Sequence, residues 1–514
     1  MSDATSGIEL SLVSHTNVGK TTLARTLLGR DIGEVRDAPH VTTVSEPHAM
    51  IRSPEGHVLT LWDTPGFGDS IRLARRLRQR SNPIGWFLAE IWDRWRDQAS
   101  WSSQQVLKTV RDQSDVVLYL VNASENPADA AYVLAEMEIL SWIGKPVLVL
   151  LNQMGEPRPR EIEEAEKNLW RDYVSRYGFV RKVMSLDAFA RCWVQEFSLL
   201  DAVASTLPGA KQAAFKSLRE AWKAQRLAAY RASAEAIARY LATLARDRER
   251  VAEGRISSTI RKLGRAIGVG DDGKPDPEAC AMLALEQRAA KALRALTDQL
   301  IDIHGLKGRA AEQVLQRLAA DWNVDVPLNE GAVGTVGAIL GGAISGLAAD
   351  LMAGGLTLGA GALVGAGLGA LGAAGIARGY NVYKGKDGAT VSWGDAGLNR
   401  TLKESLLLYL AVAHFGRGRG EWSRSEHPAY WNSTIEAAVA AQSGPLAVIW
   451  GGRTELSGSD WLEKRLSRAI DNLLGSTLNQ LYPDSQVFAT ETVPRSGVDR
   501  HVPHPAATDP GLPQ

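Results

Sequence analysis

The fold of the N-terminal part is decided by the stretch Ile8-Glu-Leu-Ser-Leu-Val-Ser14-His-Thr-Asn-Val-Gly19-Lys20-Thr21. Its apolar first half predicts a buried β-strand, and its second half has the pattern of a P-loop. In such a loop, backbone N–H groups surround the phosphates, Gly19 keeps side chains away, Lys20 reaches the β- and γ-phosphates, and the Thr21 hydroxyl binds Mg²⁺. The sequence therefore predicts a nucleoside triphosphate site.

A second motif supports this prediction further along the chain. Residues 57–62 have the pattern of a strand, and Asp63-Thr-Pro-Gly66 follows at its C-terminal end. There Asp63 can hold the metal ion, and the Gly66 N–H can sense the γ-phosphate. Because ligands sit at the C-terminal ends of parallel strands, the order strand, loop, helix, strand and DxxG fits a doubly wound nucleotide domain. The alternative, a glycine turn that binds no phosphate, does not account for this order.

Composition limits the classes of protein that fit. The 514 residues suffice for two or three domains, and Lys plus Arg balances Asp plus Glu at 58 each, so no overall charge attracts nucleic acid or an acidic surface. Cys192 and Cys280 lack the spacing of a metal site or a disulfide framework, and the chain opens on no cleavable leader pattern. We expect a cytoplasmic protein, with the inner face of the cell membrane as a second location.

The rest of the nucleotide domain follows the same α/β pattern. Residues 22–28 predict a short helix, apolar runs at 115–121 and 145–151 predict parallel strands, and residues 181–184 are a candidate for the last strand. The polar connector 38–43 has the character of a first switch, in which Thr42 or Thr43 would complete the Mg²⁺ site. We expect a doubly wound P-loop domain with a mainly parallel sheet over residues 1–207.

A helical insertion is predicted at about 68–113. It carries a basic run and then a helix that starts at Asn82-Pro83 with apolar residues at helical spacing. The basic residues are Arg72, Arg75, Arg76, Arg78 and Arg80, and the helix residues include Ile84, Leu88, Ile91 and Trp95. A membrane surface or a partner groove would suit this pattern. The alternative is that the helix packs on its own domain and the arginines are solvated.

The C-terminal half predicts a mostly α-helical domain. A long-helix region occupies 208–330, a Gly/Ala-rich apolar hairpin 331–378, further helices 379–493, and a disordered tail 494–514. Residues 331–349 and 351–377 contain no charged residue, and each segment is long enough to cross a bilayer as a helix. We therefore expect membrane contact through 331–377, with a tightly packed hairpin inside the helical domain as the alternative.

The motifs resemble a known branch of GTPases. The residues Asn17-Val-Gly19-Lys20-Thr21, Thr42-Thr43 and Asp63-Thr-Pro-Gly66-Phe67 resemble the TrmE/Era/EngA group, in which a hydrophobic residue follows DxxG. The resemblance implies GTP and GDP as ligands, a K⁺ bound by Asn17, and a G-domain homodimer. Over nearly its full length, the chain resembles bacterial proteins in which a GTPase is fused to a domain of unknown function, DUF3482. The phosphate-binding residues are then Ser14, His15, Thr16, Asn17, Val18, Gly19, Lys20, Thr21 and Thr22.

The base-binding residues depart from that group. The NKxD motif appears as Asn152-Gln153-Met-Gly155, so the carboxylate that accepts from the guanine base is missing. Losing one charge-assisted hydrogen bond costs about 1.5 to 3 kcal/mol, which would weaken discrimination against adenine. Ser185 and Asp187 stand where the last base-contact loop is expected, and Asp187 would compensate in part.

Three functional hypotheses remain open. The first is a GTPase switch with Lys20, Thr43 and Gly66 as catalytic groups. Its hydrolysis of GTP would be slow, because Phe67 after Gly66 cannot orient water, and a cation would stimulate it. Its helical half would contact a membrane or an unidentified protein partner. The second is a pseudo-GTPase scaffold that holds nucleotide as a structural ligand, and the third is a dynamin-like machine that remodels membranes. Nucleic acid is disfavoured as a partner, because no basic domain with interleaved aromatic residues follows the G domain.

Overall fold

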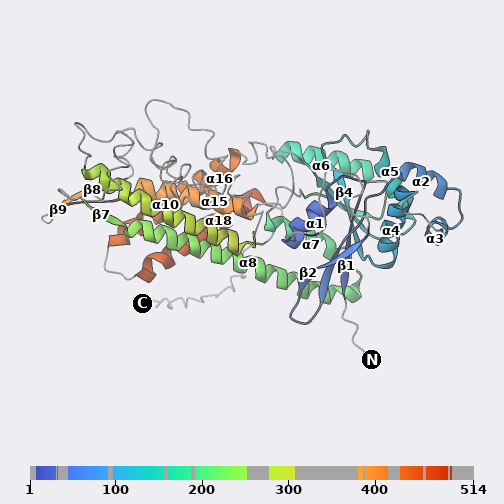
Figure 1. The fold of residues 1–514 in the computed structure, drawn as a ribbon, viewed down its shortest axis with the longest axis horizontal. Coiled ribbons are helices and arrows are strands. Elements are labelled where there is room, and N and C mark those ends of the chain that lie inside the picture. The colour runs from blue at the N-terminus through green and yellow to red at the C-terminus, as the bar shows by residue number, and fades with distance from the viewer. Residues whose placement is uncertain are drawn as a thin grey trace, which may run out of the picture.

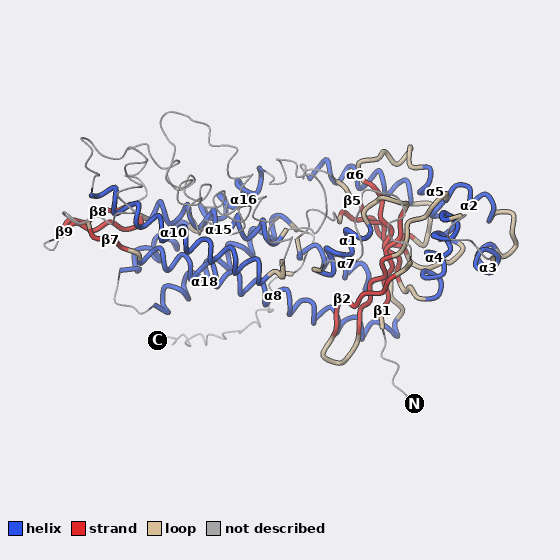
Figure 2. Tube along the Cα trace, viewed as in Figure 1, coloured by secondary structure: helices blue, strands red, loops and turns tan. Residues whose placement is uncertain are grey.

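The chain forms an elongated molecule with an α/β domain at one end and a helical bundle at the other (Figure 1). The computed structural model describes residues 7–30, 32, 44–90, 97–154, 160–186, 192–251, 277–306, 380–385, 388–414, 429–454, 459–483, 485 and 487–488. The α/β class expected for the first part and the helical class expected for the second are both confirmed. Figure 2 shows the two parts by secondary structure, with the main sheet confined to the first part.

The sheet of the α/β domain has six strands in the order β2-β3-β1-β4-β5-β6. All neighbours pair in parallel except β2 and β3, which form an antiparallel pair. The strands are β1 Ile8–Ser14, β2 Glu46–Arg52, β3 Val58–Asp63, β4 Val116–Asn122, β5 Val147–Asn152 and β6 Val180–Ser185. Because parallel strands end at the same edge of a sheet, Ser14, Asp63, Asn152 and Ser185, the last residues of β1, β3, β5 and β6, are brought to one edge.

The sheet separates two hydrophobic cores, and alternate residues of each central strand enter different ones. In β4, Leu118 and Leu120 belong to the first core, whereas Val117, Tyr119 and Val121 belong to the second. This alternation follows from the two-residue repeat of a β-strand. Both sides of the central strands are therefore apolar, which explains why their sequences are nearly continuous hydrophobic runs.

Helices cover both faces of this sheet. The first core contains residues of α1 and α7, and the second contains residues of α2 to α6. The helices are α1 Lys20–Leu28, α2 Ser70–Leu77, α3 Pro83–Ala89, α4 Gln98–Asp112, α5 Ala131–Ser141, α6 Arg160–Val174 and α7 Trp193–Ala204. Helix α4 packs against β1 and joins β3 to β4 as a crossover helix, so the additional elements within 68–113 are α2 and α3.

Helix α8, Gly209–Arg246, connects the two parts. Its 38 residues correspond to a length of about 57 Å at 1.5 Å per residue. It contacts β2, β3 and α7 of the α/β domain, and it also packs along α10, α15 and α18 of the bundle (Figure 1). The first core runs along it without interruption from the sheet into the bundle.

The bundle and a small sheet form the other end of the molecule. Its elements are α10 Pro277–Ile303, α15 Asp395–Ala413, α16 Ala429–Ala441, α17 Ser443–Gly451, the short 3₁₀ helix η2 Gly452–Thr454, and α18 Ser459–Leu481. Strands β7 Arg248–Arg250, β8 Tyr380–Gly385 and β9 Gly388–Trp393 form an antiparallel sheet in the order β7-β9-β8. Within the expected long-helix region 208–330, the chain leaves the helix at Asp247, and residues 248–250 pair with β9.

Several predicted segments lie outside the described residues. These are the apolar hairpin 331–378, the tail 494–514 and the connector 38–43. Among the residues that the structure describes, none of the helices combines the length and the apolar character needed to cross a membrane.

Candidate nucleotide-binding site

The P-loop joins the end of β1 to the start of α1. Its backbone turns through left-handed conformations at Asn17, with φ 66°, and at Gly19, with φ 92°. A Cβ atom at Gly19 would lie 2.8 Å from Nδ2 of Asn152, so both the backbone conformation and the space require glycine here. Lys20, Thr21 and Thr22 form the first turn of α1, which places a helix N-terminus beneath the loop as an anion site requires.

The Lys20 ammonium lies inside the loop. It donates to Oγ of Ser14 at 2.9 Å and to the carbonyl oxygen of His15 at 3.3 Å, and the residue is only 7% exposed. Burial lowers the pKa of Lys20 to about 8, although the nearby carboxylates of Asp63 and Glu136 oppose this effect. A buried ammonium that interacts only weakly with neutral oxygens would be strongly stabilised by phosphate oxygens.

Asp63 and Thr21 form the expected metal-binding pair. The Thr21 hydroxyl donates to Oδ2 of Asp63 at 2.7 Å, whereas the buried Oδ1 of Asp63 has no hydrogen-bond partner among the residues that the structure describes. Burial raises the pKa of Asp63 to about 6, although the Thr21 hydroxyl and the charges of Lys20 and Arg25 oppose this effect, so a further positive charge would stabilise the ionised carboxylate. A Mg²⁺ ion shared by this carboxylate, the hydroxyl, phosphate oxygens and water would supply that charge. Within the described ranges, no group of three or more His, Cys, Asp or Glu residues forms a separate metal cluster.

The DxxG segment lies directly against the P-loop. The Phe67 N–H donates to the Ser14 carbonyl oxygen at 2.9 Å, and Phe67 pairs with His15 in a parallel bridge. A Cβ atom at Gly66 would lie 2.8 Å from the Cα atom of Thr16, so only glycine permits this approach. The Phe67 side chain is fully buried and therefore offers no polar group to an attacking water.

The loop after β5, where contacts to the base are expected, contacts the P-loop from the other side. Asn152 is fully buried and donates from Nδ2 to the carbonyl oxygen of Val18 at 2.7 Å. Gln153 has a left-handed backbone, with φ 56°, and its Nε2 lies 3.4 Å from the Asn17 carbonyl oxygen. Ser185 is the last residue of β6 and pairs with Leu151. Together these contacts attach the base loop to the phosphate loop.

Four residues that the sequence analysis discussed for the nucleotide site fall outside the described ranges. They are Thr42, Thr43, Gly155 and Asp187. The roles assigned to Thr42 and Thr43 at Mg²⁺ and to Asp187 at the base therefore stay predictions.

Sequence reasoning did not identify the residues behind the P-loop. Nδ1 of His15 lies 2.8 Å from Oε1 of Glu136, whose other oxygen accepts from the Tyr119 hydroxyl at 2.6 Å. The His15 ring also stacks near Tyr132, with ring centroids 4.5 Å apart. One signal was available, because Glu136 is an acidic residue within the otherwise apolar stretch Val133–Met137 of α5.

The insertion packs on its own domain through apolar residues. Ile84 and Phe87 of α3 are buried in the second core, and Gln104 of α4 donates to the carbonyl oxygens of Phe87 and Glu90 at 3.0 and 2.8 Å. Helix α3 ends at Ala89, and Ile91 and Trp95, the last two residues of the expected helical spacing, lie outside the described ranges.

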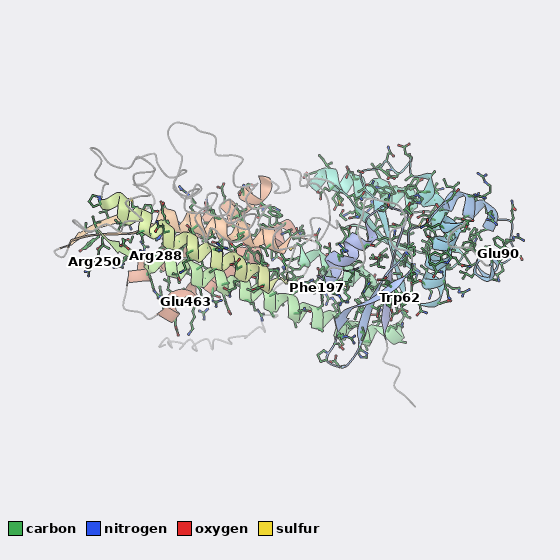
Figure 3. The ribbon with its side chains drawn as sticks, viewed as in Figure 1. Trp62, Glu90, Phe197, Arg250, Arg288 and Glu463 are labelled. Atoms are coloured by element: carbon green, nitrogen blue, oxygen red, sulfur yellow. The ribbon has the colours of Figure 1, made fainter. Side chains whose placement is uncertain are left out.

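The arginines of the insertion are exposed except for Arg76, which is half-buried, and three of them have partners. Arg78 donates to both carboxylate oxygens of Glu138, and Arg76 and Arg80 lie over the Trp86 ring at 5.7 and 4.3 Å from its centroid. In Figure 3, Glu90 marks the end of α3 and lies at the opposite end of the molecule from Arg250 of β7. The insertion is therefore remote from the outer tip of the bundle.

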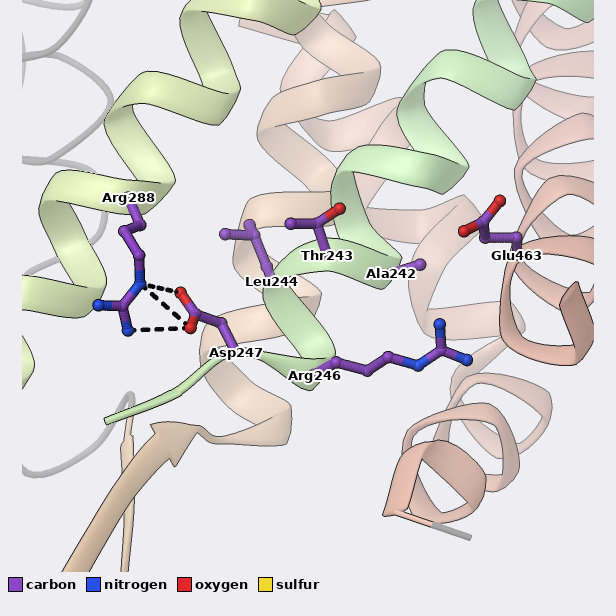
Figure 4. Close-up of a pocket in the computed structure, with 7 residues that line it drawn as sticks. All are labelled: Ala242, Thr243, Leu244, Arg246, Asp247, Arg288 and Glu463. Atoms are coloured by element: carbon purple, nitrogen blue, oxygen red, sulfur yellow. Dashed lines mark hydrogen bonds and ion pairs between the residues drawn. The ribbon is translucent and has the colours of Figure 1, made fainter. Parts of the chain in front are cut away.

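A hollow of about 370 Å³ lies in the bundle. Figure 4 shows its lining, in which Arg288 is paired with Asp247. Arg288 also donates to Glu249 at 2.7 Å, so its guanidinium is already occupied. The lining combines Arg246 and Arg288 with Asp247 and Glu463, and this balance of charge favours no charged ligand.

Comparisons with known proteins agree with this division of the chain. The family described as 50S ribosome-binding GTPase matches residues 9–153, and the family described as domain of unknown function (DUF3482) matches residues 171–451, more than half of the chain. The GTPase Era of Heliobacterium modesticaldum is 26% identical over 145 residues, which cover 28% of this chain and 39% of that protein. The match thus spans well under half the length of this relative.

Solved structures of Era were also found. A single-residue variant of Aquifex aeolicus Era bound to GDP·AlF4⁻ is 19% identical, with 39% of this chain and 57% of that chain covered and a TM-score of 0.29. Era in complex with MgGDPNP and a fragment of 16S ribosomal RNA is 18% identical over the same shares, also with a TM-score of 0.29. From the family matches and the site geometry, the chain belongs to the DUF3482 family, in which an Era-type P-loop GTPase domain precedes the DUF3482 domain.

Proposed function

We propose that the chain is a GTP-dependent switch that binds GTP with Mg²⁺ and hydrolyses it slowly. The observation that carries this proposal is the buried, unpartnered Oδ1 of Asp63 beside the Thr21 hydroxyl. An unpaired buried carboxylate oxygen is costly unless a cation binds it. Lys20 lies in the same loop system, so a triphosphate and its Mg²⁺ would satisfy both buried charges together.

Slow hydrolysis follows from the residue after DxxG. Phe67 is buried and cannot position water, so the chain must rely on the loop amides, Lys20 and Mg²⁺ to stabilise the transition state. The resemblance to the TrmE/Era/EngA group suggests K⁺ at Asn17 as a substitute for an arginine finger, with a G-domain homodimer as the setting. Asn17 is exposed on the loop, where a cation could reach it.

The surface that would respond to GTP is α2. This helix begins at Ser70, four residues after Gly66, and Gly68 packs so closely on α4 that a Cβ atom there would lie 2.5 Å from that of Ala99. Arg72 and Arg75 are exposed on α2. Ordering of the DxxG segment by the γ-phosphate would shift this basic face, which suits a protein partner with an acidic surface. Membrane contact through 331–377 remains a separate proposal that rests on the sequence of that segment.

The alternative of a pseudo-GTPase scaffold has one point in its favour, which is the apolar Phe67. A scaffold needs no buried metal site, however, and here Asp63, Thr21 and Lys20 keep the full set of charges and hydrogen bonds around it. These residues favour a protein that turns over its nucleotide.

Turnover with and without K⁺ tests the proposal. We expect the wild type to release phosphate slowly from GTP, faster in K⁺ than in Na⁺, and Lys20→Ala to lose turnover. Lys216→Ala, at an exposed position of α8, serves as the matched control and should behave as the wild type. Turnover that is unchanged in Lys20→Ala would contradict the proposal, and bound GTP without any turnover would favour the scaffold.

A further inference from the structure

Glu136 is a fully buried acidic residue directly behind the P-loop. It lies on α5, where its neighbours Ala135 and Met137 belong to the second core. A buried carboxylate is costly, and an apolar residue of similar size at such a position would often stabilise the fold equally well. Its presence therefore calls for an explanation other than packing.

Both carboxylate oxygens of Glu136 have defined partners. Oε1 lies 2.8 Å from Nδ1 of His15, and Oε2 accepts from the Tyr119 hydroxyl at 2.6 Å. Tyr119 comes from the core of β4 and is itself fully buried, so the carboxylate is held on a rigid element. Tyr132, whose ring lies against His15, donates in turn to Glu125 at 2.8 Å. The His15 ring is thus fixed by a carboxylate and by an aromatic face.

His15 is the residue at which the parts of the nucleotide site meet. Its carbonyl oxygen accepts from Lys20, and its backbone pairs with Phe67 of the DxxG segment. Its side chain, which is 30% exposed, points to Glu136 and away from these contacts. A residue that holds the His15 ring consequently holds the first turn of the P-loop, together with its contacts to Lys20 and Phe67.

We propose that Glu136 is a positioning residue of the nucleotide site, which acts through His15 to keep the P-loop in its phosphate-binding conformation. This inference rests on the proposed binding of GTP. Glu136 does not belong to the motifs that define the site, and it makes no contact with Lys20, Thr21 or Asp63 among the hydrogen bonds of the described residues. Pre-organisation of this kind matters because a small displacement of a binding group can lower affinity or rate about a hundredfold.

The test compares two carboxylates on the same helix. Glu136→Gln removes the charge next to His15, whereas Glu138→Gln removes the charge that pairs with Arg78 and leaves the P-loop untouched. We expect Glu136→Gln to raise the Kd for a fluorescent GTP analogue on the order of ten- to a hundredfold, mainly through faster dissociation. Glu138→Gln should bind as tightly as the wild type. Circular dichroism and the thermal midpoint check that each variant is folded.

A double-mutant cycle separates positioning from a general effect on the fold. If Glu136 acts through His15, then the pair Glu136→Gln with His15→Ala should bind no more weakly than His15→Ala alone. A purely structural role would instead lower the thermal midpoint and leave the dissociation rate of the folded protein unchanged.

Each result has one meaning. Unchanged GTP affinity in folded Glu136→Gln, or losses that add in full in the double variant, would overturn the inference. Failure of the wild type to bind GTP would instead overturn the proposed function. If Glu136→Gln does not fold, Tyr119→Phe provides a second test, because it leaves the carboxylate in place but removes the hydroxyl that donates to Oε2. We then expect Tyr119→Phe to bind the GTP analogue more weakly than the wild type. An unchanged affinity would contradict the inference.

Discussion

The two faces of the six-stranded sheet differ in what they are joined to. The face covered by α1 and α7 shares one hydrophobic core with the whole helical half, which continues along α8 into α10, α15 and α18. The core on the other face, under α2 to α6, is confined to the α/β domain. The helical half is therefore fused to the nucleotide domain on one side, and the segment that follows DxxG is free to respond on the other.

Polar contacts reinforce the fused face. Lys211 of α8 lies 2.6 Å from Oδ2 of Asp115 and donates to the carbonyl oxygen of Gly7 at 3.1 Å, and Arg226 pairs with both oxygens of the buried Glu196. Near the β2–β3 turn, Ser217 of α8 donates to Glu55. Since β2 and β3 join the two switch segments, α8 is the element through which the nucleotide site could affect the bundle.

The largest expected effect comes from breaking the shared core. Trp193 is buried between the two parts, donates to the Tyr409 hydroxyl at 3.1 Å and packs on Phe197 and Tyr230. Trp193→Ala should lower the free energy of unfolding by about 3 to 5 kcal/mol and loosen both parts together. Phe87→Ala in the second core is the matched control and should loosen only the α/β domain. Hydrogen exchange resolved by segment would show this difference, and bundle segments that stay protected in Trp193→Ala would contradict a shared core.

The next effect concerns the ion pair between α7 and α8. Glu196 is fully buried, and Arg226, which also lies 4.1 Å from the Trp222 ring centroid, supplies its charge partner. Arg226→Met should lower the free energy of unfolding by about 3 kcal/mol, because it removes the charge that both oxygens of this buried carboxylate accept from. Adding Glu196→Gln should restore part of that loss, as measured by denaturant unfolding. A double variant that is weaker than Arg226→Met would show that the pair is not the cause.

The pH dependence of stability tests two ionisable groups of the helical half, His304 and Glu286. Burial lowers the pKa of His304 to about 4 and raises the pKa of Glu286 to about 7. As the pH falls from 6.5 to 4, the unfolded chain protonates His304 before the folded chain does, so stability is lost. As the pH rises from 4.5 to 7, the unfolded chain ionises Glu286 first, and stability is lost in that direction.

Single variants separate these two opposing effects. Relative to the wild type, the free energy of unfolding of Glu286→Gln should increase by about 3 kcal/mol between pH 4.5 and 7. That of His304→Gln should increase by a similar amount, again relative to the wild type, as the pH falls from 6.5 to 4. Denaturant unfolding at a series of pH values measures both differences. If the difference in free energy of unfolding between a variant and the wild type is independent of pH, the substituted group does not titrate as its burial requires.

The smallest effect is expected on the exposed side of α2. Arg72→Ala and Arg75→Ala should change the free energy of unfolding by less than about 0.5 kcal/mol and leave GTP binding unaltered, since both side chains are exposed. Arg78→Ala, which removes the pair with Glu138, is the informative comparison and should cost somewhat more. A large loss in Arg72→Ala would mean that this face is already engaged within the chain.

The sequence was sufficient to predict the strands and loops whose local residue pattern agrees with their position in the fold. Strands β4 and β5 are nearly continuous apolar runs, and the loops after β1 and β3 carry motifs whose glycines the geometry requires. Strand β2 was not predicted, because as the edge strand it has only Ile51 fully buried among mostly exposed residues. The pairing of β7 with β9 joins residues more than a hundred positions apart, which no local pattern reveals.

The same distinction applies to the site. Lys20, Thr21 and Asp63 lie together as their motifs indicate. Glu136 could not be assigned, since its partners His15 and Tyr119 are brought to it only by the packing of α5 on the sheet. The continuous core between the two halves was equally inaccessible, because helical stripes show that a face is buried but not against which element.

The most direct test of the central claim is a calorimetric titration of GTP into the wild type and into Asp63→Asn, with and without Mg²⁺. Because one oxygen of the buried Asp63 carboxylate has no hydrogen-bond partner among the described residues, Mg²⁺ should strengthen GTP binding to the wild type on the order of tenfold or more and have little effect on Asp63→Asn. Equal affinities in both proteins with and without Mg²⁺, or no heat of GTP binding to folded wild type, would contradict the account.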